Sequence, residues 1–237
     1  MPASPHTRVH SATAPPTVPV ILTACAVLFD MDGTIVDSSV PIRTCWGQWA
    51  DRHGLDVREV LHVAHGRRSQ DTIRHVLAHR GPDVARAETA WLDDCELREA
   101  HATRPLPGIR TLLDALPVGR WGIVTSAALE VCRRRLVAAG LPTPAVIVSG
   151  EDVTHGKPAP DGYQLGAARL GVAPADCLAC EDTPTGIAAG RDAGMRIIGL
   201  VTTHAADVLG GCEVLRGDWL GVQVTTTPDA ITLTFRT

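Results

Sequence analysis

The sequence predicts an α/β fold, a Rossmann-like parallel sheet with helices on both faces, together with an inserted small all-helical domain. Short apolar runs alternate with helical patterns after residue 105, which is typical of a parallel sheet covered on both sides. Residues 39–103 contain helical patterns but no strand-like run. The 237 residues, 45% of them hydrophobic, suffice for a large core that carries a smaller domain.

The first residues of the chain show no pattern of a helix or a strand. Residues 1–20 contain five prolines among Ser, Thr and Ala without periodicity, so we expect a disordered tail over residues 1–23. The continuous apolar run Ala24–Phe29 then predicts a buried parallel strand. The longest apolar stretch, Val18–Phe29, is too short for the roughly 20 residues of a membrane span. It also lacks a small-residue cleavage site, so we expect a cytoplasmic protein without membrane contact.

The remaining elements follow in order along the chain. We expect a core domain made of residues 24–36 and 106–237, with a domain of four helices inserted over residues 37–105. Within the core, apolar runs predict further strands at 121–125, 145–148, 177–180 and 196–200. Helical patterns between them predict helices at about 109–116, 127–139, 160–170 and 184–193. The segments Trp219–Val224 and Ile231–Phe235 predict a hairpin at one edge of the sheet.

Charge and cysteine content exclude two classes of function. The chain has 22 Lys and Arg against 26 Asp and Glu, without the basic stripe expected of a nucleic-acid-binding protein. Its seven cysteines are scattered and odd in number, which predicts reduced thiols and not a disulfide framework. Cys177 and Cys180 form a C-x-x-C, but no second pair accompanies them as a zinc site would require.

Polar residues follow several of the predicted strands, where ligands of open α/β sheets bind. Asp30 and Asp32 follow the first strand, and alternate residues of an extended segment point the same way. Their carboxylates could hold a divalent cation or divide into a nucleophile and an acid/base, although an Asp-rich turn is the alternative. Thr125 and Ser126 follow the next strand at the start of a helix, a position that favours an anion but also suits an ordinary N-cap.

Two more positions complete the pattern. Lys157 lies in a stiff Gly-Lys-Pro-Ala-Pro-Asp loop, and Glu181 and Asp182 lead into a helix. Each position alone fits a solvated lysine or a capping acid. Together, an acid pair, a hydroxyl, a lysine and a second acid pair suit phosphoryl transfer, because metal and lysine balance the phosphate charge while an aspartate attacks. A Walker loop is excluded because Pro158 stands where Ser or Thr is required.

Across residues 24–237 the sequence resembles the haloacid-dehalogenase (HAD) superfamily. Four motifs carry the resemblance: Leu28-Phe-Asp-Met-Asp-Gly-Thr34, Val124-Thr-Ser126, Gly156-Lys-Pro-Ala-Pro-Asp161 and Glu181-Asp-Thr-Pro-Thr-Gly-Ile187. The resemblance implies that the inserted helices form a C1-type cap over the core. It also implies that Asp30 becomes an aspartyl-phosphate and that Asp32 is the general acid/base.

The same resemblance implies the remaining site residues. Mg²⁺ would be held by Asp30, the main-chain oxygen of Asp32, and Asp182, with Glu181 behind them. Thr125 and Lys157 would bind phosphate, and Lys157 would also keep the nucleophile ionised. We expect Thr34 and Ser126 to contact the substrate as well.

The helical segment narrows the resemblance to one group within the superfamily. Residues Ala64–Asp71 are similar to a segment of the glycerol-phosphatase and 2-deoxyglucose-6-phosphatase group, in which Arg67 often has an aromatic counterpart. Arg68 is the candidate for a cap-side substrate contact, with a surface arginine as the alternative. We therefore expect a monomeric or weakly dimeric Mg²⁺-dependent phosphatase, acting on a small sugar or polyol phosphate through an aspartyl-phosphate. The alternatives are a β-phosphoglucomutase-like phosphosugar mutase and a phosphoglycolate-type phosphatase.

Overall fold

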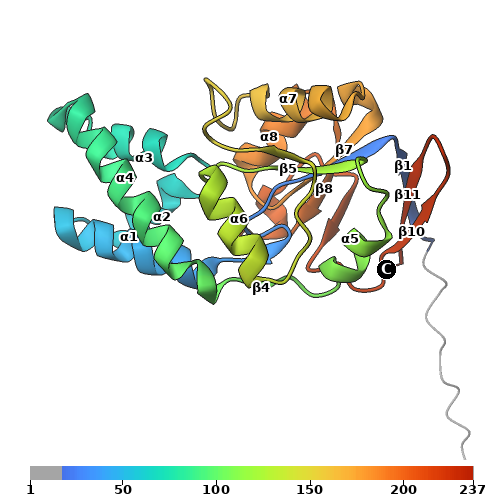
Figure 1. Ribbon diagram of the computed structural model, residues 1–237, viewed down its shortest axis with the longest axis horizontal. Coiled ribbons are helices and arrows are strands. Elements are labelled where there is room, and N and C mark those ends of the chain that lie inside the picture. Colours follow the sequence, from blue (N-terminus) through green and yellow to red (C-terminus); the bar gives the residue numbers. More distant parts are fainter. Residues whose placement is uncertain (1–17, 237) are drawn as a thin grey trace, which may run out of the picture.

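The computed structural model describes residues 18–236, so most of the predicted tail lies outside it. Figure 1 shows three parts along the long axis: a group of helices at one end, a sheet with flanking helices in the middle, and a small second sheet at the other end. No helix within residues 18–236 is both long and apolar enough to cross a bilayer.

The central sheet has six strands in the order β6-β5-β2-β7-β8-β9, and every neighbouring pair is parallel. Its strands are β2 (Ala26–Phe29), β5 (Trp121–Val124), β6 (Val146–Val148), β7 (Cys177–Glu181), β8 (Arg196–Leu200) and β9 (Val214–Arg216). The predicted fold class is confirmed. The sequence did not predict β9, because its three half-exposed residues are too few to show a period.

Helices cover both faces of this sheet, as predicted. One face carries α5 (Ile109–Ala115) and α6 (Leu129–Ala138), and the other carries α7 (Asp161–Leu170) and α8 (Pro184–Asp192). Strand β2 contributes to both cores because its side chains alternate: Val27 and Phe29 pack on the α5–α6 side, whereas Ala26 and Leu28 pack on the α7–α8 side. Within residues 18–236, four short 3₁₀ turns complete the helical elements: Ala78–Arg80, Ala100–Ala102, Pro174–Asp176 and Ala206–Val208.

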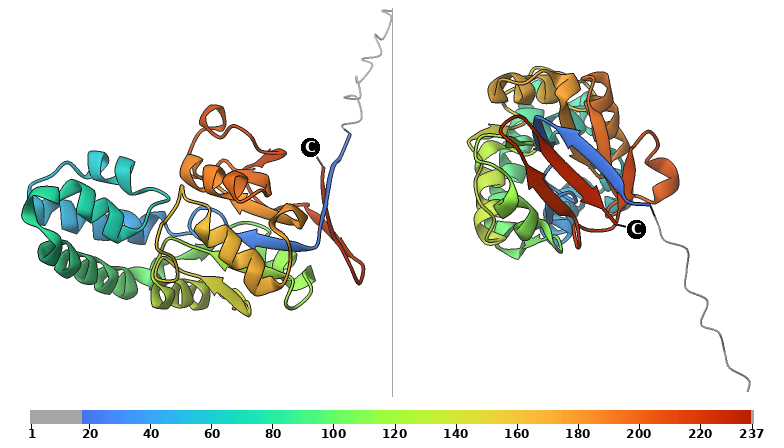
Figure 2. Two further views of the ribbon diagram at one scale, coloured as in Figure 1. Left: turned by 90° about the horizontal axis from the view of Figure 1, so that it is seen from above. Right: turned by 90° about the vertical axis from the view of Figure 1, so that its right-hand side faces the viewer.

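The small sheet corrects two predictions. Strands β10 (Gln223–Thr226) and β11 (Ile231–Phe235) form a hairpin as predicted, but its first strand begins four residues later than expected. The hairpin also lies in a separate antiparallel sheet with β1 (Val20–Ala24) and not at an edge of the main sheet (Figure 2). The predicted tail was therefore wrong for residues 20–23. They form a strand because they pair with β11, and the alternating Leu22 and Ala24 pack into the core on the α5–α6 side.

Between β2 and α5 the chain leaves the core to build four helices: α1 (Ser39–His53), α2 (Val57–Ala64), α3 (Ser69–Val76) and α4 (Pro82–Glu99). We call residues 39–102 the helical unit. It has a hydrophobic cluster of its own, which includes the fully buried Trp49, Ile73 and Leu92. The two connections to the core pair with each other as the short antiparallel strands β3 (Val36–Asp37) and β4 (Arg104–Pro105).

Candidate active site

Most of the predicted site residues lie at the carboxyl ends of β2, β5 and β7, which are neighbours in the sheet, and Lys157 reaches them from the loop after β6. A cavity of about 620 Å³ opens there between the core and the helical unit. The core lines it with Asp30, Asp32, Thr125, Ser126 and Asp182, among others. The helical unit lines it with residues that include Ile42, Arg43, Trp46, His65, Arg67 and Glu96.

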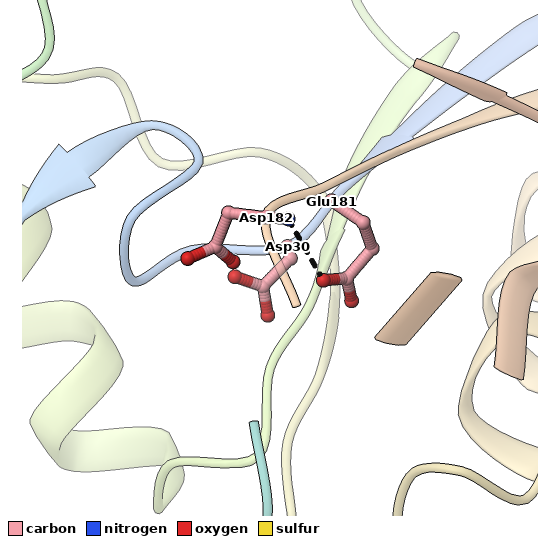
Figure 3. Close-up of side chains that lie close together, drawn as sticks. All are labelled: Asp30, Glu181 and Asp182. Carbon is pink, nitrogen blue, oxygen red and sulfur yellow. Dashed lines mark hydrogen bonds between the residues drawn. The ribbon is translucent and has the colours of Figure 1, made fainter. Parts of the chain in front are cut away.

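Three carboxylates meet at the core side of this cavity. Asp30, Glu181 and Asp182 each place a carboxylate oxygen within 4.8 Å of the other two, as Figure 3 shows. All three residues are buried. Burial, reinforced by the neighbouring Glu181 and Asp32 and opposed by Lys157, raises the pKa of Asp30 to about 7. Burial and the neighbouring Asp30 and Glu181 also raise the pKa of Asp182 well above its usual range.

Lys157 supplies the positive charge in this cluster. Its Nζ donates to Asp30 Oδ1 and Glu181 Oε1, both at 2.6 Å, and to the main-chain oxygen of Val124 at 3.1 Å. Burial alone would lower the pKa of Lys157, but the two carboxylates outweigh it and raise that pKa. One ammonium among three carboxylates leaves an excess of negative charge, which a divalent cation would balance.

The donor set fits a hard cation, which prefers oxygen ligands. Glu181 is the least available of the three carboxylates. Its oxygens already accept hydrogen bonds from Lys157, from the Tyr163 hydroxyl at 2.8 Å, and from the Asp182 backbone N–H at 3.1 Å. It therefore suits a supporting place behind the metal, whereas Asp30 and Asp182 face the cavity as candidate ligands.

Asp182 is packed closely by the turn after β2. Gly33 has a φ of +83°, and a Cβ added there would lie 2.1 Å from Asp182 Oδ2, so this close approach requires glycine. The hydroxyl of Thr203, which sequence reasoning missed, donates to Asp182 Oδ2. These contacts fix the Asp182 carboxylate beside Asp30.

The structure corrects the prediction that Thr34 contacts the substrate. Thr34 is fully buried and is not among the residues that line the cavity. Its hydroxyl donates to Asp182 Oδ1 at 3.4 Å, and its main-chain oxygen accepts from Trp219 Nε1 at 2.8 Å. Thr34 therefore supports the acidic cluster from behind.

Thr125 and Ser126 both line the cavity, as the sequence predicted. The Thr125 hydroxyl accepts from the Ala127 N–H at 3.1 Å. The Ser126 hydroxyl donates to the main-chain oxygen of Gly66, in the helical unit, at 3.0 Å. Their contact with phosphate stays a prediction, and Ser126 in addition joins the core to the helical unit.

Asp32 has a partner that sequence reasoning missed. Arg135 of α6 donates through Nη1 to Asp32 Oδ2 at 2.8 Å and through Nη2 to Glu96 Oε2 at 3.2 Å. Burial, opposed by Arg135, raises the pKa of Glu96 to about 7. A signal was present: Arg135 follows Val131 by four positions on the buried face of α6, and Glu96 follows Leu92 by four on the buried face of α4.

Arg68 does not line the cavity, although the sequence predicted a cap-side substrate contact for it. All five of its guanidinium N–H groups have acceptors elsewhere. Two reach the Asp71 carboxylate at 2.6 and 3.1 Å. The others reach main-chain oxygens of Gly150, Val153 and Thr154, in the loop between β6 and α7, at 2.8–3.3 Å. Arg68 is thus not a surface arginine, and it ties the helical unit to the core instead of lining the cavity.

Comparisons with known proteins assign the family. Residues 26–194 match the model of the haloacid dehalogenase-like hydrolases. The chain is 43% identical to hexitol phosphatase A of Escherichia coli over 72% of its length and 80% of that protein. It is 32% identical to glycerol-1-phosphate phosphohydrolase 1 of Saccharomyces cerevisiae, over 84% of each chain.

A solved structure supports the fold independently. The crystal structure of a hydrolase from Pseudomonas syringae superposes with a TM-score of 0.74 at 23% identity, covering 83% of this chain and 94% of that one. The family match spans more than half of the chain and includes the site residues Asp30, Lys157 and Asp182. The chain therefore belongs to the haloacid dehalogenase-like hydrolases.

Proposed function

We propose that this protein is a Mg²⁺-dependent phosphatase that hydrolyses a small sugar or polyol phosphate through an aspartyl-phosphate on Asp30. The observation that carries the proposal is the placement of Asp30. One of its oxygens is held by Lys157, and its carboxylate lies within the acidic cluster at the wall of the cavity. Such a carboxylate is oriented, partly charge-balanced and exposed to a bound substrate, as a nucleophile must be.

The proposed reaction uses two aspartates. An oxygen of Asp30 attacks phosphorus while the ester P–O bond breaks, and Asp32 gives a proton to the departing alcohol oxygen. Asp32 then takes a proton from water, whose oxygen attacks phosphorus and releases Asp30 and inorganic phosphate. A divalent cation held by Asp30, Asp182 and the main-chain oxygen of Asp32, with Glu181 behind them, would balance the phosphate charge.

Lys157 has two tasks in this scheme. Burial raises the pKa of Asp30, which would leave the carboxyl partly protonated and unreactive, and the Lys157 ammonium opposes that rise. Its hydrogen bond to Asp30 Oδ1 also fixes which carboxylate oxygen remains free. Thr125 and Ser126 would orient the phosphate from the adjacent strand end.

The helical unit would serve as the cap that selects the substrate, with boundaries at residues 37–105. A phosphoryl group alone gives the core nothing with which to distinguish substrates, whereas the opposite wall of the cavity consists of helical-unit side chains. The names of the relatives, a hexitol phosphatase and a glycerol-1-phosphate phosphohydrolase, favour a polyol or sugar as the alcohol part. The seven free cysteines fit the reducing cytoplasm.

Phosphate release from a panel of phosphorylated compounds tests the proposal. The panel would contain hexitol, glycerol and sugar phosphates and phosphoglycolate, each with Mg²⁺ or with EDTA. We expect the highest kcat/KM on a polyol or sugar phosphate and no release with EDTA. A preference for phosphoglycolate would contradict the substrate class. A mutase would instead return an isomer without net phosphate release and would depend on a bisphosphate primer.

A further inference from the structure

Arg135 forms a buried bridge between the two halves of the candidate site. It lies on α6 of the core, and its side chain is 1% exposed. One end of its guanidinium holds Asp32 Oδ2 at 2.8 Å, and the other reaches Glu96 Oε2 on α4 of the helical unit at 3.2 Å. A single side chain thus connects the expected acid/base to the part of the protein that would close over the substrate.

Two polar atoms of this bridge are left over. Within residues 18–236, Asp32 Oδ1 and Arg135 Nε are buried without a hydrogen-bond partner. Burying a polar group without a partner costs free energy. A bridge that served stability alone would be expected to pair these atoms, as Arg68 pairs all five of its donors.

Arg135 fixes the carboxylate of Asp32 at the wall of the cavity. Its hydrogen bond to Oδ2 restricts rotation of the carboxylate, while Oδ1 accepts no hydrogen bond and is itself buried. Because the positive charge of the Arg135 guanidinium is shared between Asp32 and Glu96, it balances the negative charge of Asp32 only in part. A guanidinium suits this task because its planar fork reaches two carboxylates at once, which a lysine ammonium cannot do in the same geometry.

We propose that Arg135 is a positioning residue for Asp32, anchored by Glu96, and that it holds the Asp32 carboxylate in place for proton transfer to the leaving alcohol. This inference rests on the proposed function. In the first half of the reaction the proton of Asp32 moves to the ester oxygen as the P–O bond breaks and Asp30 bonds to phosphorus. In the second half, water gives its proton back to Asp32. Because Glu96 belongs to the helical unit, proton transfer becomes most effective when that unit is in place.

The dependence on the leaving group tests this inference. An alkyl phosphate such as glycerol or hexitol phosphate needs a proton on its departing oxygen, whereas p-nitrophenyl phosphate needs little help. The parameter kcat/KM covers the steps up to phosphoryl transfer to Asp30 and excludes the later attack by water. We expect Arg135→Met to lower kcat/KM about 100-fold on the alkyl phosphate and less than about 10-fold on the aryl phosphate.

Three further variants complete the design. Arg135→Lys keeps the charge but loses the planar fork, so we expect the loss of kcat/KM to be smaller but again greater on the alkyl phosphate. This variant replaces Arg135→Met if the latter does not fold. Glu96→Gln should show a weaker loss in the same direction. Arg134→Met is the matched control, because Arg134 is the neighbouring exposed arginine that pairs with Glu130 on the surface; it should leave both substrates unchanged.

Each result decides between two explanations. Equal losses on both substrates, or no loss, in the folded Arg135 variants would overturn the inference and leave Arg135 a structural ion pair. Asp32→Asn separates this failure from that of the proposed function. If Asp32→Asn loses alkyl-phosphate activity selectively while the Arg135 variants do not, only the inference fails. If Asp32→Asn shows no selectivity either, the acid/base assignment itself is wrong.

Discussion

The core lines its side of the cavity mainly with residues that follow strands, whereas the helical unit lines the opposite side with residues from several helices and the loops between them. On the core side, Asp30 and Asp182 occupy the ends of adjacent strands and share a lysine-balanced cluster. On the helical side, Trp46, Arg67 and Glu96 come from α1, the loop after α2, and α4. Changes in the acidic cluster of the core should therefore affect every substrate alike, and changes in helical-unit side chains that line the cavity should alter which substrate is preferred.

The largest effect is expected for Asp30→Asn. The amide keeps the shape of the side chain but cannot form an acyl phosphate, so turnover should fall at least about a thousandfold on alkyl and aryl phosphates alike. Steady-state phosphate release on both substrate types measures this, with Asp51→Asn, at an exposed position of α1, as the control. Residual activity above about a thousandth of wild type, or a loss confined to one substrate, would rule Asp30 out as the nucleophile.

Asp182→Asn should come next. It removes one negative ligand oxygen from the cluster, so the Mg²⁺ concentration for half-maximal activity should rise at least about 100-fold, whichever substrate is used. Titration of EDTA-treated protein with Mg²⁺ gives this value, and calorimetry without substrate gives the metal affinity itself. An unchanged requirement for Mg²⁺ would show that the metal binds elsewhere.

On the helical side we expect a selective effect from Arg67→Ala. Arg67 lines the cavity and is exposed to it, so its loss should change the ranking among sugar and polyol phosphates. A lost charge-assisted contact corresponds to a factor of about 10–100 in kcat/KM for the best natural substrate. Hydrolysis of p-nitrophenyl phosphate should hardly change. An equal loss on both kinds of phosphate would place Arg67 outside substrate selection.

The neighbouring Arg68→Ala should have the smallest effect on catalysis and should not alter the ranking. Its hydrogen bonds go to Asp71 and to the loop after β6, so we expect a loss of about 1–3 kcal/mol in the free energy of unfolding. Chemical denaturation measures this, with Arg74→Ala, at an exposed position of α3, as the control. A changed ranking with unchanged stability would restore Arg68 as a substrate contact.

The residues that could be predicted from sequence are those fixed by short-range rules. A strand end places its next residues at one edge of the sheet, so Asp30, Thr125, Lys157 and Asp182 could be grouped before their contacts were known. The adjacent Arg67 and Arg68 could not be told apart, because the difference depends on the rotation of one loop against the core. Strand β1 was missed for a related reason: its residues become a strand through pairing with β11, at the far end of the described chain.

The pairing of β1 with β11 also determines when the small sheet can form during synthesis of the chain. Strand β1 leaves the ribosome before the rest of the core, yet its partner β11 is made only after nearly all of the described chain. Until then the apolar Leu22 and Ala24 lack the strand that covers them, and they remain available for contacts with chaperones or with other unfinished chains. The small sheet therefore forms late, because its hydrogen bonds cannot form until the enzyme has been synthesised through to β11.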